Sequence, residues 1–128
     1  MTRYLLDTDA LIDFSKGKEP ATSLILSWID GSDVVSVCAV TVAEFFSGIS
    51  AARAAPWWDF VLSLAYADIT AEAAMHAGQD RYRYARSGHV LTTTDALLAA
   101  VTRDSDATLV TGNIKHYPME GLSLLSIR

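Results

Sequence analysis

The sequence predicts an α/β fold: a three-layer sandwich with a mostly parallel central sheet and helices on both faces. Short apolar runs rich in β-branched residues alternate along the chain with longer helix-like stretches, which is the order of successive βα units. The apolar runs are continuous rather than alternating with polar residues, as expected for strands buried on both faces. Hydrophobic residues make up 51% of the chain, which is ample for such a core.

The first strand and its helix are closely spaced. Arg3–Leu6 is the apolar run, and carboxylates follow it immediately at Asp7 and Asp9. Thr8 is placed to cap a helix whose inner face begins at Leu11, because a threonine oxygen can accept from a free backbone N–H of the first turn. The Lys16-Gly17-Lys18 segment is expected to end this helix.

A second helix, a turn and a second strand come next. Pro20 suits the first turn of a helix that runs to Ile29, because proline lacks only an N–H that has no partner there. Asp30–Asp33 is rich in turn-forming residues. Val34–Val37 is β-branched and predicts a buried strand, and Thr41–Ile49 has the pattern of a helix.

The middle of the chain predicts two helices around a short strand. Pro56 is expected to open a helix with a strongly aromatic face. Tyr66–Ile69 is a possible short strand. Thr70–Arg86 predicts a long helix that stops near Gly88, because glycine readily takes the left-handed conformation that ends helices.

The last third returns to the βα pattern. Three threonines and Asp95 lead into a helix over Ala96–Thr102, and strands are predicted at Ala107–Thr111 and Leu122–Ile127. No repeat or linker interrupts the 128 residues, so we expect a single domain over residues 1–128.

The bulk composition restricts the function classes. A net charge of -5 argues against a protein that binds nucleic acid through overall charge, but not against an enzyme that gathers carboxylates around cations. Cys38 is the only cysteine, which indicates a reducing, cytoplasmic setting. The longest apolar stretch, Val34–Phe46, contains Glu44 and is shorter than the roughly 20 residues that span a bilayer, so a soluble protein is expected.

Polar side chains gather where predicted strands end. Asp7 ends the first strand, Glu44 follows the second in the first turn of a helix, and Asp95 begins a late helix. Asn113 follows the strand that ends at Thr111. Because parallel strands end at one edge, these groups are expected to lie near one another. Oxygen ligands of this kind suit Mg²⁺ or Mn²⁺.

Most of these residues also have an ordinary structural explanation. Thr41-x-x-Glu44 is a capping box by pattern, and Asp95 favours a helix N-terminus electrostatically, as Asp9 does. Asn113 after a glycine is common in turns. Asp7 alone has no such explanation, and the joint occurrence at one edge favours a functional site.

The segments LLDTDALID, TVAEFFSG, TTDALLAA and TLVTGNIKHYPMEGLSLL, in this order, resemble the PIN-domain ribonucleases. More narrowly, they are similar to VapC-type toxins of prokaryotic toxin–antitoxin pairs. The resemblance extends from Tyr4 to Leu125, and the first and last segments are the most specific. It implies a PIN-like fold and a Mg²⁺-dependent endoribonuclease, with Mn²⁺ as a possible substitute.

The resemblance also implies roles for individual residues. Asp7, Glu44 and Asp95 would be the catalytic acids and metal ligands, and Thr111 would line the site through its hydroxyl. Asn113 stands where many members carry a fourth acid, which leaves a second metal position open. His116 is expected to be a structural loop residue.

Partners follow from the same resemblance: an RNA substrate, a cognate antitoxin that lies in an apolar groove, and a second copy in a homodimer. Among the basic and aromatic residues of Arg81–Arg86, Arg83 and Arg86 are the candidates for RNA contact, although a solvated helix face explains most of that cluster. No membrane association is expected, and the setting is the prokaryotic cytoplasm.

Two other functions fit parts of the sequence. Asp7-Thr8-Asp9 resembles the nucleophile motif of haloacid-dehalogenase-like phosphatases, but that family needs a later lysine and then an acidic pair, and Glu120 is the only acid after Thr111. A non-catalytic PIN-like interaction module is the second alternative, and Asn113 is the feature that favours it.

Overall fold

The five strands of the computed structural model, which describes residues 1–128, form one sheet in which every neighbouring pair is parallel. The strand order is β3-β2-β1-β4-β5, so β1 is central. The strands are β1 Arg3–Leu6, β2 Val34–Cys38, β3 Ala65–Ala67, β4 Thr108–Thr111 and β5 Ser123–Ser126. The predicted α/β class with a parallel sheet is confirmed.

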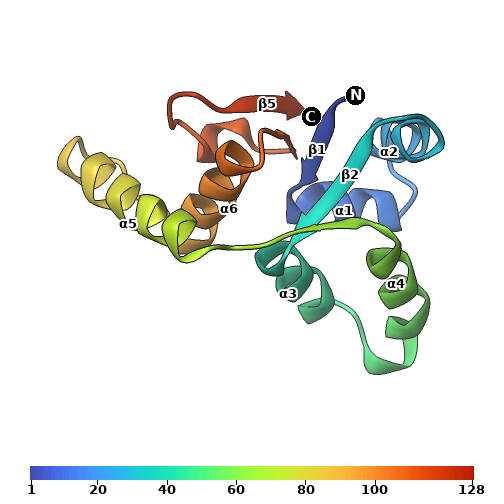
Figure 1. Cartoon of the computed structure of the whole chain (residues 1–128). Helices are drawn as coiled ribbons and strands as arrows, with labels where there is room; N and C mark the ends of the chain where they lie inside the picture. The colour runs from blue at the N-terminus through green and yellow to red at the C-terminus, as the bar shows by residue number, and fades with distance from the viewer.

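Helices cover both faces of this sheet, as Figure 1 shows, with α5 and α6 on one side and α1 to α4 on the other. Along the chain, one pair of helices follows each of the strands β1, β2 and β3, as expected for βα units. The helices are α1 Thr8–Ser15, α2 Ala21–Asp30, α3 Ala39–Ser47, α4 Ala51–Ser63, α5 Ala71–Arg86 and α6 Thr93–Asp104, and a 3₁₀ turn, η1, spans Ile114–His116. None of the helices combines the length and the apolar character needed to cross a membrane.

Two separate cores result from the alternation of side chains along each strand. Leu5 and Leu109 point to the core beneath α5 and α6, whereas their neighbours Leu6 and Val110 point to the core beneath α1 to α4. All four side chains are fully buried. Burial on both faces explains why these strands are continuously apolar in sequence.

The end of β1 differs from the prediction in one respect, since Asp7, not Thr8, caps α1. The Asp7 backbone N–H still donates to the Val110 carbonyl at 2.9 Å, which continues the ladder with β4. The chain turns into α1 within one residue of leaving the sheet. Asp7 is therefore fixed by its backbone at the carboxyl edge of the central strand.

The start of α3 was also predicted wrongly. The helix begins at Ala39 directly after β2, two residues before the predicted start at Thr41. Apolar Cys38-Ala39-Val40 resembles a continuing strand in sequence, which hides this boundary. Thr41 lies inside the helix, and its hydroxyl donates to the Leu6 carbonyl at 2.9 Å. The capping box is thereby excluded, and Glu44 lies beyond the first turn.

Two further boundaries are shifted. Pro56 lies inside α4, which begins at Ala51, so its predicted place at the helix start is wrong. The alanines around it have the highest helix propensity and extend the helix ahead of the proline. The short strand β3 comes earlier than the predicted Tyr66–Ile69, because it pairs in register with β2 from Ala65.

Candidate metal centre at the carboxyl edge of the sheet

The Asp7 carboxylate is held by three donors. The Thr8 N–H donates to Oδ1 at 2.7 Å, and the hydroxyls of Thr111 and Tyr117 donate to Oδ2, each at 2.8 Å. An ionised carboxylate has about four acceptor directions. Asp7 is therefore fixed in orientation and keeps about one acceptor direction free for a further ligand.

Tyr117 connects Asp7 to Asp95. Its hydroxyl lies 2.8 Å from Asp7 Oδ2 and 3.3 Å from Asp95 Oδ1, and the residue is only 3% exposed. Burial first, and then the charge of Asp7, raise the pKa of the Tyr117 hydroxyl well above its usual range. The hydroxyl therefore stays protonated and acts as a donor between the two carboxylates.

Asp95 stands in the first turn of α6, as predicted. The Thr92 hydroxyl caps the helix and accepts from the Asp95 backbone N–H at 3.1 Å. Asp95 Oδ2 lies 3.5 Å from His116 Nδ1 on η1. The expectation that His116 is merely a loop residue is incomplete, because its ring contacts a predicted site residue.

Glu44 reaches the same edge through Thr8. The Thr8 hydroxyl donates to Glu44 Oε1 at 2.7 Å, across the gap between α1 and α3. The bond from the Thr41 hydroxyl to the Leu6 carbonyl fixes this turn of α3 against the end of β1. Glu44 lies three residues after Thr41 on the same helix face, so this bond also sets the position of Glu44. Glu44 is exposed and carries no structural bond to its own helix N-terminus.

Thr111 and Asn113 follow β4 at the same edge. Besides its bond to Asp7, the Thr111 hydroxyl accepts from the Asn113 backbone N–H at 3.0 Å. The Asn113 side chain turns to His116, with Nδ2 3.0 Å from Nε2. Asn113 thus orients the ring that contacts Asp95, rather than contacting a carboxylate itself.

Asp9 lies beside Asp7 in surroundings that disfavour its ionised form. Its Oδ2 accepts from the Gly112 N–H at 2.8 Å, while its Oδ1 is buried without a hydrogen-bond partner. Burial, and next the charge of Asp7, raise the pKa of the Asp9 carboxyl above its ordinary value. A Cβ on Gly112 would lie 2.6 Å from Asp9 Oδ2, so only glycine permits this close approach.

Buried carboxylates elsewhere in the molecule have arginine partners. Arg103 Nη2 lies 2.6 Å from Asp80 Oδ2, and Arg128 Nη1 lies 2.5 Å from Asp13 Oδ2. Asp7 and Asp95 have hydroxyl, backbone and imidazole neighbours only. Asp7 and Asp95 thus lack an arginine or lysine ion pair, whereas Arg128, which is paired with Asp13, also lowers the pKa of the neighbouring Asp9 carboxyl.

The donor chemistry of this edge fits a hard divalent cation. No three His, Cys, Asp or Glu side chains converge closely enough to hold a metal ion by themselves. Mg²⁺ is commonly held by one or two carboxylates with several waters and substrate oxygens, so the pair of Asp7 and Asp95 is sufficient. Glu44 and the unpartnered Oδ1 of Asp9 are further oxygen atoms at the same edge.

The basic residues of α5 are divided between structural and exposed positions. The Arg81 Nε–H donates to the Leu91 carbonyl at 3.0 Å, and Arg83 lies 3.6 Å from Asp80. The Arg86 guanidinium lies 3.9 Å over the ring of Tyr82, which is 64% exposed. Arg86 with Tyr82 therefore presents a flat cationic surface, whereas Arg83 is partly engaged within the protein.

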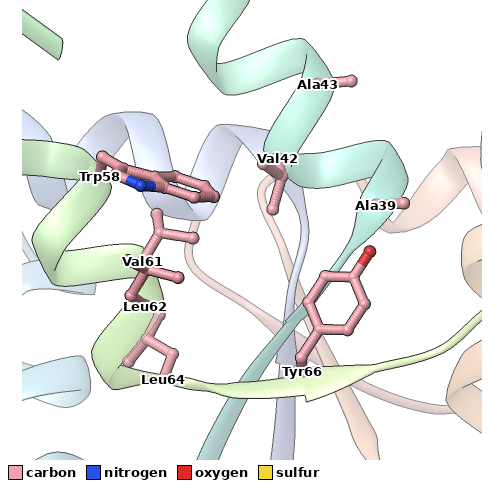
Figure 2. Close-up of a pocket in the computed structure, with 8 residues that line it drawn as sticks. All are labelled: Ala39, Val42, Ala43, Trp58, Val61, Leu62, Leu64 and Tyr66. Carbon is pink, nitrogen blue, oxygen red and sulfur yellow. The ribbon is translucent and has the colours of Figure 1, made fainter.

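An apolar groove lies between α3, α4 and the edge strand β3. It is a cavity of about 450 Å³, and all eight residues that line it are hydrophobic. Figure 2 shows the Trp58 ring and the Tyr66 ring on opposite sides of Val42. Trp58, Leu62 and Tyr66 are each about half exposed or more, so the groove is an open apolar surface. The aromatic side chains of Trp28 and Phe45, in contrast, are buried in the core.

The fold and the carboxylate edge define the class of this protein. Residues 4–120 match the PIN domain family, and the chain belongs to that family. The predicted resemblance is thereby confirmed.

Among relatives, the chain is 33% identical to ribonuclease VapC10 of Mycobacterium tuberculosis over 116 residues, which cover 90% of this chain and 86% of the relative. It is also similar to the solved structure of VapBC2 from Rickettsia felis bound to a promoter DNA fragment, with a TM-score of 0.81, 23% identity and 98% of each chain covered. A VapBC-5 structure from Mycobacterium tuberculosis, a member of the VapBC family of toxin–antitoxin systems, matches with a TM-score of 0.67 and 20% identity over 100% of this chain and 99% of that one.

Proposed function

We propose that this protein is a Mg²⁺-dependent endoribonuclease and the toxin of a VapC-type toxin–antitoxin pair. The observation that carries the proposal is the joining of Asp7 and Asp95 by one buried hydroxyl, while neither carboxylate has an arginine or lysine ion pair. Membership of the PIN family and similarity to proteins named VapC ribonucleases support the reaction class. Mn²⁺ has the same preference for oxygen and is expected to substitute.

Each of the residues at the carboxyl edge of the sheet has a role in this proposed function. Asp7 and Asp95 would hold the divalent cation, with Glu44 oriented toward the same edge by Thr8. The bound cation would orient a water, lower its pKa and neutralise charge on the phosphate. Thr111 fixes the Asp7 carboxylate, and Asn113 fixes His116. Arg86 stacked on Tyr82 offers a surface for phosphate and base contact.

Cleavage of total RNA by the purified protein tests this function directly. We expect discrete fragments with Mg²⁺ and none with EDTA. Asp7→Asn, which removes one ligand charge with little change of shape, is expected to lower the rate by about 100-fold or more. The matched control is Asp59→Asn, because Asp59 is an exposed carboxylate on α4 outside the edge.

Two outcomes would contradict the proposal. Cleavage that survives Asp7→Asn would assign the activity to another site or to a contaminating nuclease. If folded protein free of antitoxin cleaved no RNA, even total RNA from the source cell, the non-catalytic interaction module would be favoured instead.

The apolar groove is the surface that we assign to the antitoxin. An antitoxin segment with apolar side chains would bury Trp58, Leu62 and Tyr66, and Glu44 follows Ala43 of the groove directly along α3. A basic side chain at one end of that segment would complement the carboxylates and the net charge of -5. The toxin–antitoxin assemblies among similar structures support such a partner.

Leu62→Glu tests this assignment, because Leu62 is 62% exposed and its replacement places a charge in the groove without disturbing the core. We expect inhibition by the co-expressed antitoxin to weaken by about 10-fold or more, with RNA cleavage unchanged.

We also propose a homodimer, which light scattering will detect. A variant that became monomeric while still inhibited normally would assign the groove to the dimer instead.

A further inference from the structure

We propose that Tyr117 is a positioning residue for the divalent cation, which it serves by holding the carboxylates of Asp7 and Asp95 at a fixed separation. The inference rests on the proposed metal-dependent function. It assigns to Tyr117 no contact with the cation or with RNA.

The geometry singles out this hydroxyl. Tyr117 follows η1 and is 110 positions from Asp7 and 22 from Asp95 along the chain, yet its oxygen lies 2.8 Å and 3.3 Å from their carboxylate oxygens. No other side chain hydrogen-bonds to both residues among the bonds of the structure. The single hydroxyl proton is therefore shared unequally, with Asp7 as the nearer acceptor.

The physical need for such a donor follows from charge. Two carboxylates that share a partly buried site repel each other, and without a cation they would separate or one would take up a proton. A neutral donor between them lowers this cost and adds no positive charge that would compete with a metal ion. An arginine in the same place, as at Asp80, would permanently neutralise one of the two charges and would compete with a metal ion.

The ring itself is anchored by packing rather than by polar bonds. Tyr117 belongs to the core cluster beneath α5 and α6, together with Met119, Leu91 and Leu109. A phenylalanine would fill the same volume, so Tyr117→Phe removes the hydroxyl and leaves the ring contacts in place. Partners of ligating groups typically contribute 10- to 100-fold to metal affinity.

The experiment is Mn²⁺ titration of the full chain without RNA, followed by calorimetry or electron paramagnetic resonance. We expect Tyr117→Phe to bind Mn²⁺ about 10-fold or more weakly than the natural protein. The matched control is Tyr84→Phe, since the Tyr84 hydroxyl donates to the Pro118 carbonyl at 3.2 Å and touches no carboxylate. Tyr84→Phe is expected to bind Mn²⁺ normally. A merely structural role for Tyr117 would lower the melting temperature and leave Mn²⁺ affinity unchanged.

The outcomes separate this inference from the proposed function. If the natural protein binds Mn²⁺ and Asp7→Asn does not, but Tyr117→Phe binds as tightly or more tightly, the positioning role is overturned and the metal site stands. If the natural protein binds no Mn²⁺ without RNA, the positioning role is overturned, and the RNA cleavage assay with Mg²⁺ and EDTA decides the proposed function separately.

Should Tyr117→Phe not fold, 4-aminophenylalanine at position 117 carries the test. Its amino group offers one N–H to each carboxylate, so Mn²⁺ affinity equal to or above that of the natural protein is expected. A 10-fold loss with this variant, in folded protein, would overturn the proposal.

Discussion

Two groups of carboxylates in this protein have opposite electrostatic surroundings. Asp80, on α5, is 4% exposed and lies 2.6 Å from an Arg103 nitrogen on α6. Asp7 and Asp95, at the carboxyl edge of the sheet, share a tyrosine hydroxyl and have no arginine or lysine partner. A permanent counter-charge makes the first site a structural link between two helices. The second site has no such counter-charge, and this difference is the basis of the proposed metal site.

The largest expected effect comes from removing charge at the edge. Asp95→Asn should lower RNA cleavage by about 100-fold or more, because the site loses one of two paired carboxylates. Its free energy of unfolding should change by less than about 0.5 kcal/mol, since relief of repulsion offsets the lost helix N-terminal charge. Cleavage assays and urea denaturation of the same preparation measure both quantities. A large loss of stability would instead place Asp95 with the structural carboxylates.

Removing the structural carboxylate should have the reverse pattern. Asp80→Asn leaves Arg103 partly buried without its partner, which we expect to cost about 2 kcal/mol of unfolding free energy. RNA cleavage by the folded fraction should not change. Asp59→Asn, on the surface of α4, is the control and should be neutral. If Asp80→Asn proved neutral too, burial of Asp80 would not depend on its arginine.

A divalent cation should stabilise only through the edge. Mg²⁺ at tenfold its dissociation constant should raise the unfolding free energy by about 1.4 kcal/mol, because it binds the folded state. Thermal unfolding with and without Mg²⁺ measures the shift, and Asp7→Asn should abolish it while Asp80→Asn retains it. An equal shift in all variants would indicate nonspecific screening.

The smallest effect is expected at Asp9. Its pKa is raised, so the ionised form lowers stability at pH 7, and Asp9→Asn should stabilise the metal-free protein by less than about 1 kcal/mol after discounting its partial exposure. The gain should shrink as the pH falls through the raised pKa and vanish below the ordinary value of 3.8, where both states are protonated. Denaturation between pH 3 and pH 7 measures it. A gain that grew toward low pH would contradict the burial of an unpartnered Oδ1.

Much of the fold could be predicted because its periodicity is simple. The first strand was predicted at Arg3–Leu6 and occurs there, and the long helix ends at Arg86 as expected. The start of α3 could not be predicted, because Ala39 and Val40 continue the apolar character of β2. The start of α4 was predicted wrongly from Pro56, because the position of a proline is a weaker signal than the helix propensity of the nearby alanines.

The convergence of the candidate site residues could also be predicted, since parallel strands place their carboxyl ends at one edge. Asp7, Glu44, Asp95 and Thr111 were named from strand ends and the family resemblance. The structure links Asp7, Thr111 and Asp95 by hydrogen bonds, directly or through Tyr117, whereas Glu44 is connected to this edge only through Thr8. Tyr117 was missed because its place depends on the path of η1, which has no periodicity. One available signal was that a buried tyrosine, unlike phenylalanine, needs a partner for its hydroxyl.

The bonds of Asp7 to Thr111 and Tyr117 join residues more than 100 positions apart. Such long-range contacts form late, because chain closure must precede them. During synthesis from the N-terminus, the central strand β1 can pair with β2 early, but it can pair with its other neighbour only after β4 has been made. A nascent chain therefore carries the carboxylates of the edge long before it can assemble them. Synthesis itself thus delays the appearance of the assembled site until Thr111 and Tyr117 have been made.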